Sequence, residues 1–95
     1  MATFDVAHIQ EQGVDLIIVL LDPSFGLKAP IEQQRVAAAL QVCATTAGLL
    51  GVVVPVWDDG GGRMAYLAPP TLHLFFSSID LTFVAASING TLTCG

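Results

Sequence analysis

The segment WDDGGGRM, residues 57–64, places two carboxylates, three glycines and one guanidinium side by side. Successive glycine amides beside Arg63 could form a concavity that binds an anion. Asp58 and Asp59 would repel that anion, and the glycines lack the GKS/T or GxGxxG context of phosphate-binding loops. Glycine and aspartate are also the residues that a tight turn between two strands requires, so we expect a hairpin turn here. The candidate ligand-binding residues of this segment are Asp58, Asp59, Gly61 and Arg63.

A second candidate site lies in LDPSFGLKAP, residues 21–30, which connects an apolar run to an alanine-rich one. Ligands of open α/β folds bind near the carboxyl ends of strands. If Pro30 begins a helix, that helix has no Ser, Thr, Asp or Asn cap, and its first amides could bind an anion beside Ser24 and Lys28. The alternative is that Glu32 reaches back to one of these amides and that Lys28 is only solvated. Ser24 and Lys28 are therefore further candidate ligand-binding residues.

Neither catalysis nor metal binding has a recognisable pattern in this sequence. His8 and His73 are the two histidines, and no Asp or Ser pairs with either of them at a diagnostic spacing. Ser77 and Ser78 lack a GxSxG motif or another activating context. We therefore predict no catalytic residue, no metal ligand and no cofactor. We therefore favour a non-catalytic role for the protein, and leave enzymatic activity open.

The two cysteines are expected to be free thiols. Cys43 falls within the alanine-rich segment and Cys94 is next to the last residue, with no CxxC or Cys/His spacing. Residues 1–12 contain neither the basic region nor the apolar region of a secretory signal, so we predict a cytoplasmic location. Disulfides are rare in that reducing compartment.

The composition excludes nucleic acid as a partner and argues against a membrane span. Lys28, Arg35 and Arg63 are the only basic residues and the formal net charge is −5, so counterion release can hardly drive nucleic-acid binding. Residues 36–57 carry no charge and are numerous enough to cross a bilayer as a helix. They contain Pro55, however, and change from alanine-rich to β-branched, which predicts a helix followed by a strand.

Hydrophobic patterning predicts strands and helices along the chain. The run GVDLIIVLLD, residues 13–22, is apolar on both alternating faces, as in a central strand covered on both sides. Residues 3–9 are expected to pair with it as an edge strand, with a short helix as the alternative. A helix is predicted from Pro30, with Gly48 as its C-terminal cap. The remaining predictions are strands at residues 49–57, 63–69 and 81–88 and a short helix within residues 69–79.

From residue 13 onward, the order β, α, β, β, α, β matches the ferredoxin-like plan. We therefore predict one α+β domain, residues 1–95, with an antiparallel or mixed sheet, two helices on one face and an extra N-terminal strand or short helix. Pro55 agrees with this plan, because prolines in sheets favour edges. The N-terminal strand does not agree with it, because the plan leaves no place for that strand beside residues 13–22.

These features predict a small homo-oligomeric interaction or regulatory module. Only 12% of the residues are charged, against about 25% in typical soluble domains. With both helices on one face of the sheet, the other face would expose more apolar surface than monomers usually leave uncovered. We expect a dimer around a twofold axis, most simply with that sheet face as the interface. The expected contact residues are Ile18 and Val84, with Ala38 and Val42 as a secondary contact.

Two alternatives remain open. One is a different protein partner, whose identity the sequence does not indicate. The other is a domain that binds a small anion or metabolite, or acts on it as an enzyme, with its site at the subunit interface near residues 24–28 or 58–63. Added ligand would raise the melting temperature of such a domain, whereas the stability of an interaction module would depend on protein concentration.

Overall fold

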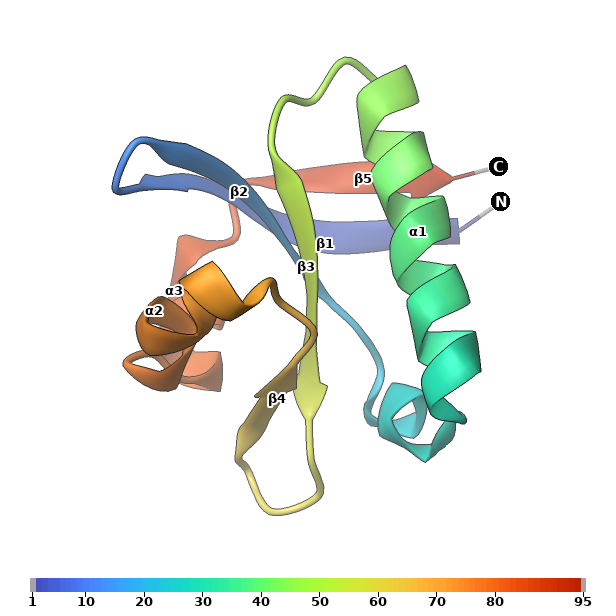
Figure 1. Cartoon of the computed structure of the whole chain (residues 1–95), viewed down its shortest axis with the longest axis vertical. Coiled ribbons are helices and arrows are strands. Elements are labelled where there is room, and N and C mark those ends of the chain that lie inside the picture. Colours follow the sequence, from blue (N-terminus) through green and yellow to red (C-terminus); the bar gives the residue numbers. More distant parts are fainter. Residues whose placement is uncertain (1, 95) are drawn as a thin grey trace.

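A hairpin forms the middle of a five-stranded mixed sheet in the computed structural model, which describes residues 2–94 (Figure 1). The strands are β1 (Ala2–Glu11), β2 (Val14–Leu20), β3 (Val52–Asp58), β4 (Met64–Tyr66) and β5 (Gly90–Cys94). The helices are α1 (Pro30–Thr46), α2 (His73–Ser77) and α3 (Leu81–Ser87), with the short 3₁₀ helices η1 (Pro23–Leu27) and η2 (Pro70–Leu72). The sheet order is β4-β3-β2-β1-β5, in which β2 and β3 are parallel and the other neighbours are antiparallel.

The hairpin of β1 and β2 turns at Gln12 and Gly13, whose φ angles are 52° and 79°. A type I′ turn needs positive φ at both central residues, and its twist matches that of the flanking strands. Residues 3–9 are therefore strand, and the helix alternative is wrong. β1 is not an edge strand as expected, because β5 pairs with its other side.

α1 connects the two parallel strands and covers one face of the sheet (Figure 1). Pro30 is its first residue, where the missing amide hydrogen costs no intrahelical bond. Gly48 follows the helix with a φ of 83°, and the Leu49 amide donates to the Ala44 carbonyl. Both predicted helix ends are thereby confirmed. Neither α1 nor any other helix within residues 2–94 has the length and apolarity needed to cross a membrane.

β3 carries Pro55 although it pairs with β2 on one side and β4 on the other. The expected edge position is therefore wrong. The Pro55 carbonyl accepts from the Leu67 amide at 3.0 Å, so the hydrogen-bonding side of this residue faces β4 rather than β2. β4 ends at Tyr66, and the missing N–H of Pro55 falls where regular pairing has ended.

Residues 81–88 were expected to form a strand, and this prediction is wrong because most of them form α3. Asp80 accepts a hydrogen bond from the Phe83 amide at 2.8 Å and so caps the helix. Val84 and Ile88, four positions apart, pack into the same core, which is a helical spacing. A cap residue before a short apolar run is the signal that the strand interpretation overlooked.

Helices cover both faces of the sheet, so the protein has two apolar cores (Figure 1). Alternate residues of β2 enter opposite cores, as predicted for a central strand. The core under α1 contains Val6, Ile17, Val19, Leu40, Ala44, Val53 and Leu92. The core under α2 and α3 contains Ala7, Leu16, Ile18, Val54, Val56, Phe76 and Val84.

This arrangement corrects the ferredoxin-like plan. The strand order differs, and α2 and α3 lie on the sheet face opposite to α1 rather than beside it. The predicted uncovered sheet face is therefore absent from the described residues. Ile18 and Val84 are each 0% exposed, because the C-terminal third of the chain folds back over that face.

A disulfide between Cys43 and Cys94 joins α1 to β5, with the two Cα atoms 5.8 Å apart. The prediction of two free thiols is therefore wrong. β5 pairs with β1, and its Leu92 shares a core with the last turns of α1, which brings together two cysteines 51 positions apart. The contact follows from the sheet order, which no local sequence pattern reveals.

Candidate interaction surface

The outward side of α1 exposes several apolar side chains around Arg35. Ile31 is 62% exposed and Val42 is 66% exposed, and Ala38 and Ala39 are exposed between them. Ile31, Ala38 and Val42 lie at i, i+7 and i+11, which places them on one side of a helix with 3.6 residues per turn. We call Ile31, Ala38, Ala39, Val42 and Thr46 the α1 face.

Only a narrow stripe of α1 is buried against the sheet, so much of the apolar surface of the helix stays exposed. Leu40 and Ala44 are buried, while Val36 and Cys43 are only partly buried. Ala47 is exposed because the helix has ended by that residue. Alanine and threonine elsewhere on the helix add no charge to its outer side.

Glu32 and Arg35 are the only charged residues of α1. The Arg35 Nη1 lies 3.0 Å from the Glu32 Oε1, and the two side chains are 69% and 50% exposed. A pair this exposed contributes at most about 0.5 kcal/mol, because water screens it. Its consequence is electrostatic neutrality: α1 has no net charge in a chain whose formal net charge is −5.

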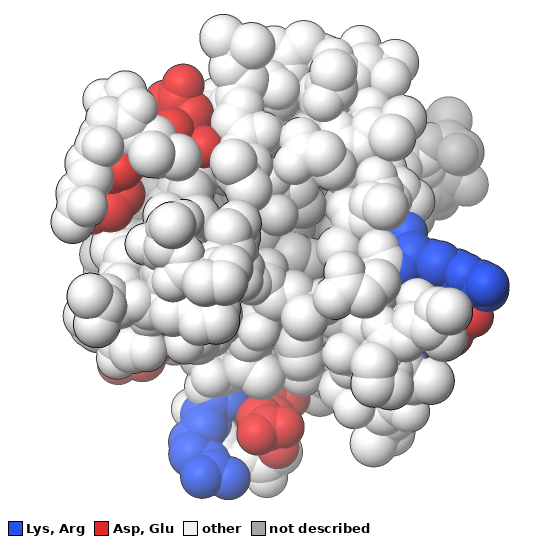
Figure 2. Space-filling view, viewed as in Figure 1, with Lys and Arg blue, Asp and Glu red and all other residues white. Residues whose placement is uncertain are grey.

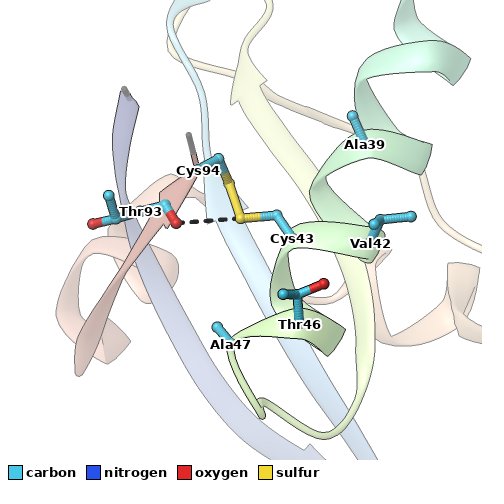
Figure 3. A pocket seen from close by; sticks show the side chains of 7 residues that line it. All are labelled: Ala39, Val42, Cys43, Thr46, Ala47, Thr93 and Cys94. Atoms are coloured by element: carbon cyan, nitrogen blue, oxygen red, sulfur yellow. Dashed lines mark hydrogen bonds between the residues drawn. A yellow bond between two sulfur atoms is a disulfide. The ribbon is translucent and has the colours of Figure 1, made fainter.

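A hollow of about 450 Å³ opens between α1 and β5 (Figure 3). Its lining residues are Ala39, Val42, Cys43, Thr46, Ala47, Thr93 and Cys94, none of them charged. The disulfide crosses from the helix to the strand, and the Thr93 carbonyl oxygen lies 3.3 Å from the Cys43 Sγ (dashed in Figure 3). Three of the lining residues also belong to the α1 face, so the hollow and that face form one continuous surface.

The two loops predicted to bind a ligand meet at the carboxyl ends of β2 and β3. A second hollow there, of about 370 Å³, is lined by Pro23, Ser24, Gly26, Leu27, Asp58, Asp59 and Gly60. The structure thus brings Ser24 together with Asp58 and Asp59. The candidate residues Lys28, Gly61 and Arg63 are not part of this lining.

The glycine-rich loop uses its own amides. Asp58 Oδ1 accepts from the amides of Gly60 and Gly62 at 2.8 and 3.1 Å, and the Asp59 amide donates to the Arg63 carbonyl at 2.8 Å. Gly60 and Gly62 have φ angles of 98° and 76°, which favour glycine. The segment is a turn between β3 and β4, as predicted. Asp58 occupies two of the amides that an anion would need.

The start of α1 offers no better anion site. Ala29 precedes the helix and supplies no side-chain cap, and Glu32 bonds Arg35 instead of reaching back to an amide as the alternative proposed. Asp22 accepts a hydrogen bond from the Ser24 amide at 2.9 Å, which lowers the pKa of Asp22 below its ordinary value. This carboxylate therefore stays charged close to the second hollow, whose own wall already carries two more. The electrostatics disfavour an anion there.

The remaining polar candidates support the fold. His8 Nε2 donates to the Leu50 carbonyl and His73 Nε2 to the Ala68 carbonyl, each at 2.9 Å. Such bonds hold the imidazoles in place and leave no base aimed at a nucleophile. Within residues 2–94, no group of three or more His, Cys, Asp or Glu residues is arranged to hold a metal ion.

The sequence did not single out Ile31, Thr93 or the cysteine pair as parts of a surface. Ile31 shares the helical phase of Ala38 and Val42, so its position could have been inferred. Thr93 and Cys94 reach the helix only through the pairing of β5 with β1.

Comparison with protein-family models, curated proteins and solved structures found no match. The fold and its surfaces define the class to which the chain belongs. It is a mixed α+β fold with helices on both faces of a five-stranded sheet. The exposed side of α1 is largely apolar, carries the neutral Glu32–Arg35 pair and lies beside a disulfide.

Proposed function

We propose that the protein is a homo-oligomeric interaction module, a dimer that associates through the α1 face and has no catalytic chemistry of its own. The observation that carries this proposal is the exposure of Ile31 and Val42 on one side of α1, at 62% and 66%. Large apolar side chains gathered on one surface, with small residues between them, are typical of interfaces.

Electrostatics favour a second copy of the chain as the partner. Two copies that each carry a net charge of −5 repel one another wherever carboxylates meet. On α1 the two charges cancel, so copies can approach there without that cost. Figure 2 shows charged side chains near the margins of the view, with broad uncharged surface between them. Ala38 and Ala39 would allow the two helix backbones to come close.

The size of the surface is consistent with a dimer only if the hollow takes part. A helix of 17 residues is about 25 Å long at 1.5 Å per residue. A standard interface buries about 800 Å² on each partner, which a single narrow helix stripe hardly supplies. The hollow beside β5 widens the contact, and its apolar lining could receive a side chain of the partner's helix.

Two earlier expectations change in this proposal. Ile18 and Val84 are buried in the core and cannot contact a partner. We therefore place the proposed interface at Ala38, Val42 and their neighbours instead of on the sheet. If the protein is cytoplasmic, as proposed, its disulfide is transient or redox-sensing, because lasting disulfides are rare in that compartment.

The test compares Val42→Asp with Thr82→Asp by size-exclusion chromatography and light scattering at low micromolar concentration. The wild type is expected to have about twice the chain mass of 9.9 kDa. Val42→Asp should be a monomer, because each copy would bury a carboxylate in an apolar contact. Thr82→Asp adds the same charge at an exposed position of α3 and should remain a dimer. A monomeric wild type would overturn the proposal.

A second function is favoured by one observation: Ser24, Asp58 and Asp59 converge on one hollow at the carboxyl ends of two parallel strands. Its carboxylates suit a small metabolite with amine or hydroxyl groups better than an anion. A ligand of that chemistry should raise the melting temperature at fixed protein concentration, and Asp59→Asn should weaken the effect. If compounds of that chemistry leave the melting temperature unchanged, this second function is discarded.

A further inference from the structure

The Cys43–Cys94 disulfide lies in the wall of the hollow that adjoins the α1 face (Figure 3). Both cysteines are only partly buried, and the hollow beside them holds about 450 Å³. Thiol–disulfide exchange requires that an attacking thiolate reach one of the two sulfurs. The hollow provides this access in a single copy of the chain.

The reduced state also has a local hydrogen-bond partner. The Thr93 carbonyl oxygen, 3.3 Å from the Cys43 Sγ, accepts no hydrogen from a disulfide sulfur, because that sulfur carries none. Once the bond is reduced, the Cys43 thiol can donate its hydrogen to this carbonyl. Both redox states therefore fit the same backbone geometry at this position.

We propose that Cys43–Cys94 is a thiol–disulfide exchange site whose access is controlled by association of the chain with itself, an inference that rests on the proposed dimer. Ala39, Val42 and Thr46 belong both to the α1 face and to the lining of the hollow. A partner that packs on this face covers the hollow and excludes the attacking thiol. This control is kinetic, because covering the hollow slows both the reduction and its reverse and by itself shifts neither the redox equilibrium nor the association equilibrium.

The exchange consumes two small thiol groups and is balanced in two steps. A thiolate attacks one cysteine sulfur, the S–S bond breaks, and the other cysteine leaves as a thiolate that takes up a proton. A second thiolate attacks the resulting mixed disulfide, which frees the first cysteine and releases the oxidised small disulfide. Two electrons pass from the two small thiols to the protein. The small disulfide can oxidise the two cysteines again by the same two steps in reverse.

The test measures the rate at which dithiothreitol reduces the disulfide, over protein concentrations that span the dimer equilibrium. The wild type should react several-fold more slowly as a dimer than as a monomer, because the rate of exchange depends on access to the sulfur. Ile31→Asp should react at the fast rate at every concentration, because it breaks the α1 face without lining the hollow. Thr82→Asp, with the same added charge, should behave as the wild type.

The outcomes separate this inference from the proposed function. A wild type that light scattering shows to be a dimer, yet that reacts at the same rate as Ile31→Asp, overturns the inference and leaves the dimer intact. A wild type that is monomeric at all concentrations overturns both. Circular dichroism of the reduced protein adds a further check: loss of the fold on reduction would make the bond purely structural and contradict exchange between two folded states.

Discussion

Trp57 depends on the absence of a side chain at Gly26. The indole is 5% exposed and packs edge-on against Phe25, with ring centroids 4.8 Å apart. A Cβ atom added to Gly26 would lie 2.7 Å from Trp57 Nε1 and 3.2 Å from its Cδ1. These distances are too short for a rigid aromatic ring in a packed core. One missing methyl group therefore allows η1 to close over the end of β3.

At this scale we predict that Gly26→Ala destabilises the fold by about 1–3 kcal/mol, the usual cost of overpacking. Gly61→Ala is the matched control, because nothing lies within 4 Å of its added Cβ atom and its backbone does not need glycine. The control should change the free energy of unfolding by less than about 0.5 kcal/mol. Urea unfolding at a fixed protein concentration measures both. Equal stabilities for the two variants would show that the indole has room to move.

The helices and strands show how capping residues decide between alternatives that hydrophobicity leaves open. Residues 81–88 are apolar enough for either a strand or a helix. The carboxylate of Asp80 bonds the Phe83 amide at 2.8 Å and satisfies a donor that only a helix leaves free. α3 then covers the sheet face on which Ile18 lies.

At the scale of this element, Asp80→Ala should lower the free energy of unfolding by about 1 kcal/mol, because the cap is lost. Asp80→Asn keeps an oxygen acceptor at the same place and should stay within a few tenths of a kcal/mol of the wild type. Thermal melts followed by circular dichroism can resolve this difference, which corresponds to about 4–8 °C in a fold of this size. An alanine variant as stable as the asparagine variant would mean that packing alone holds α3.

For the whole molecule, the disulfide ties the edge strand β5 to α1 across 51 positions of sequence. Cross-linking residues this far apart restricts the unfolded chain and stabilises a fold by about 2–4 kcal/mol. The bond therefore stabilises the whole fold, and in our proposal its own accessibility depends on association of the chain.

We predict that Cys43→Ser and Cys94→Ser each cost about 2–4 kcal/mol of unfolding free energy, since either change removes the same cross-link. The free energy of unfolding of the double variant should equal that of the single variants to within a few tenths of a kcal/mol, because the two positions act as one unit. Denaturant unfolding at one protein concentration compares all three. Losses that add in the double variant would indicate that each cysteine contributes by packing instead.

The sequence by itself determined the elements that depend on residues close together in the chain. Pro30 and Gly48 mark the ends of α1, the apolar run of residues 13–22 marks a strand covered on both sides, and residues 58–63 form a turn. It also indicated Ala38 and Val42 as apolar contact residues, and both side chains are exposed on α1. Each of these follows from local backbone preferences and side-chain periodicity.

Only the tertiary structure decided what covers each apolar surface. A strand that is apolar on both faces requires two covers, but its pattern is the same whether the second cover is a helix of the same chain or another copy of the protein. Here α2 and α3 provide it, which buries Ile18 and Val84, while the outer side of α1 keeps exposed apolar side chains. The disulfide likewise depends on β5 lying beside β1, a contact between the two ends of the chain. Such long-range contacts are set by the total burial of apolar area over the whole fold, which local patterns do not specify.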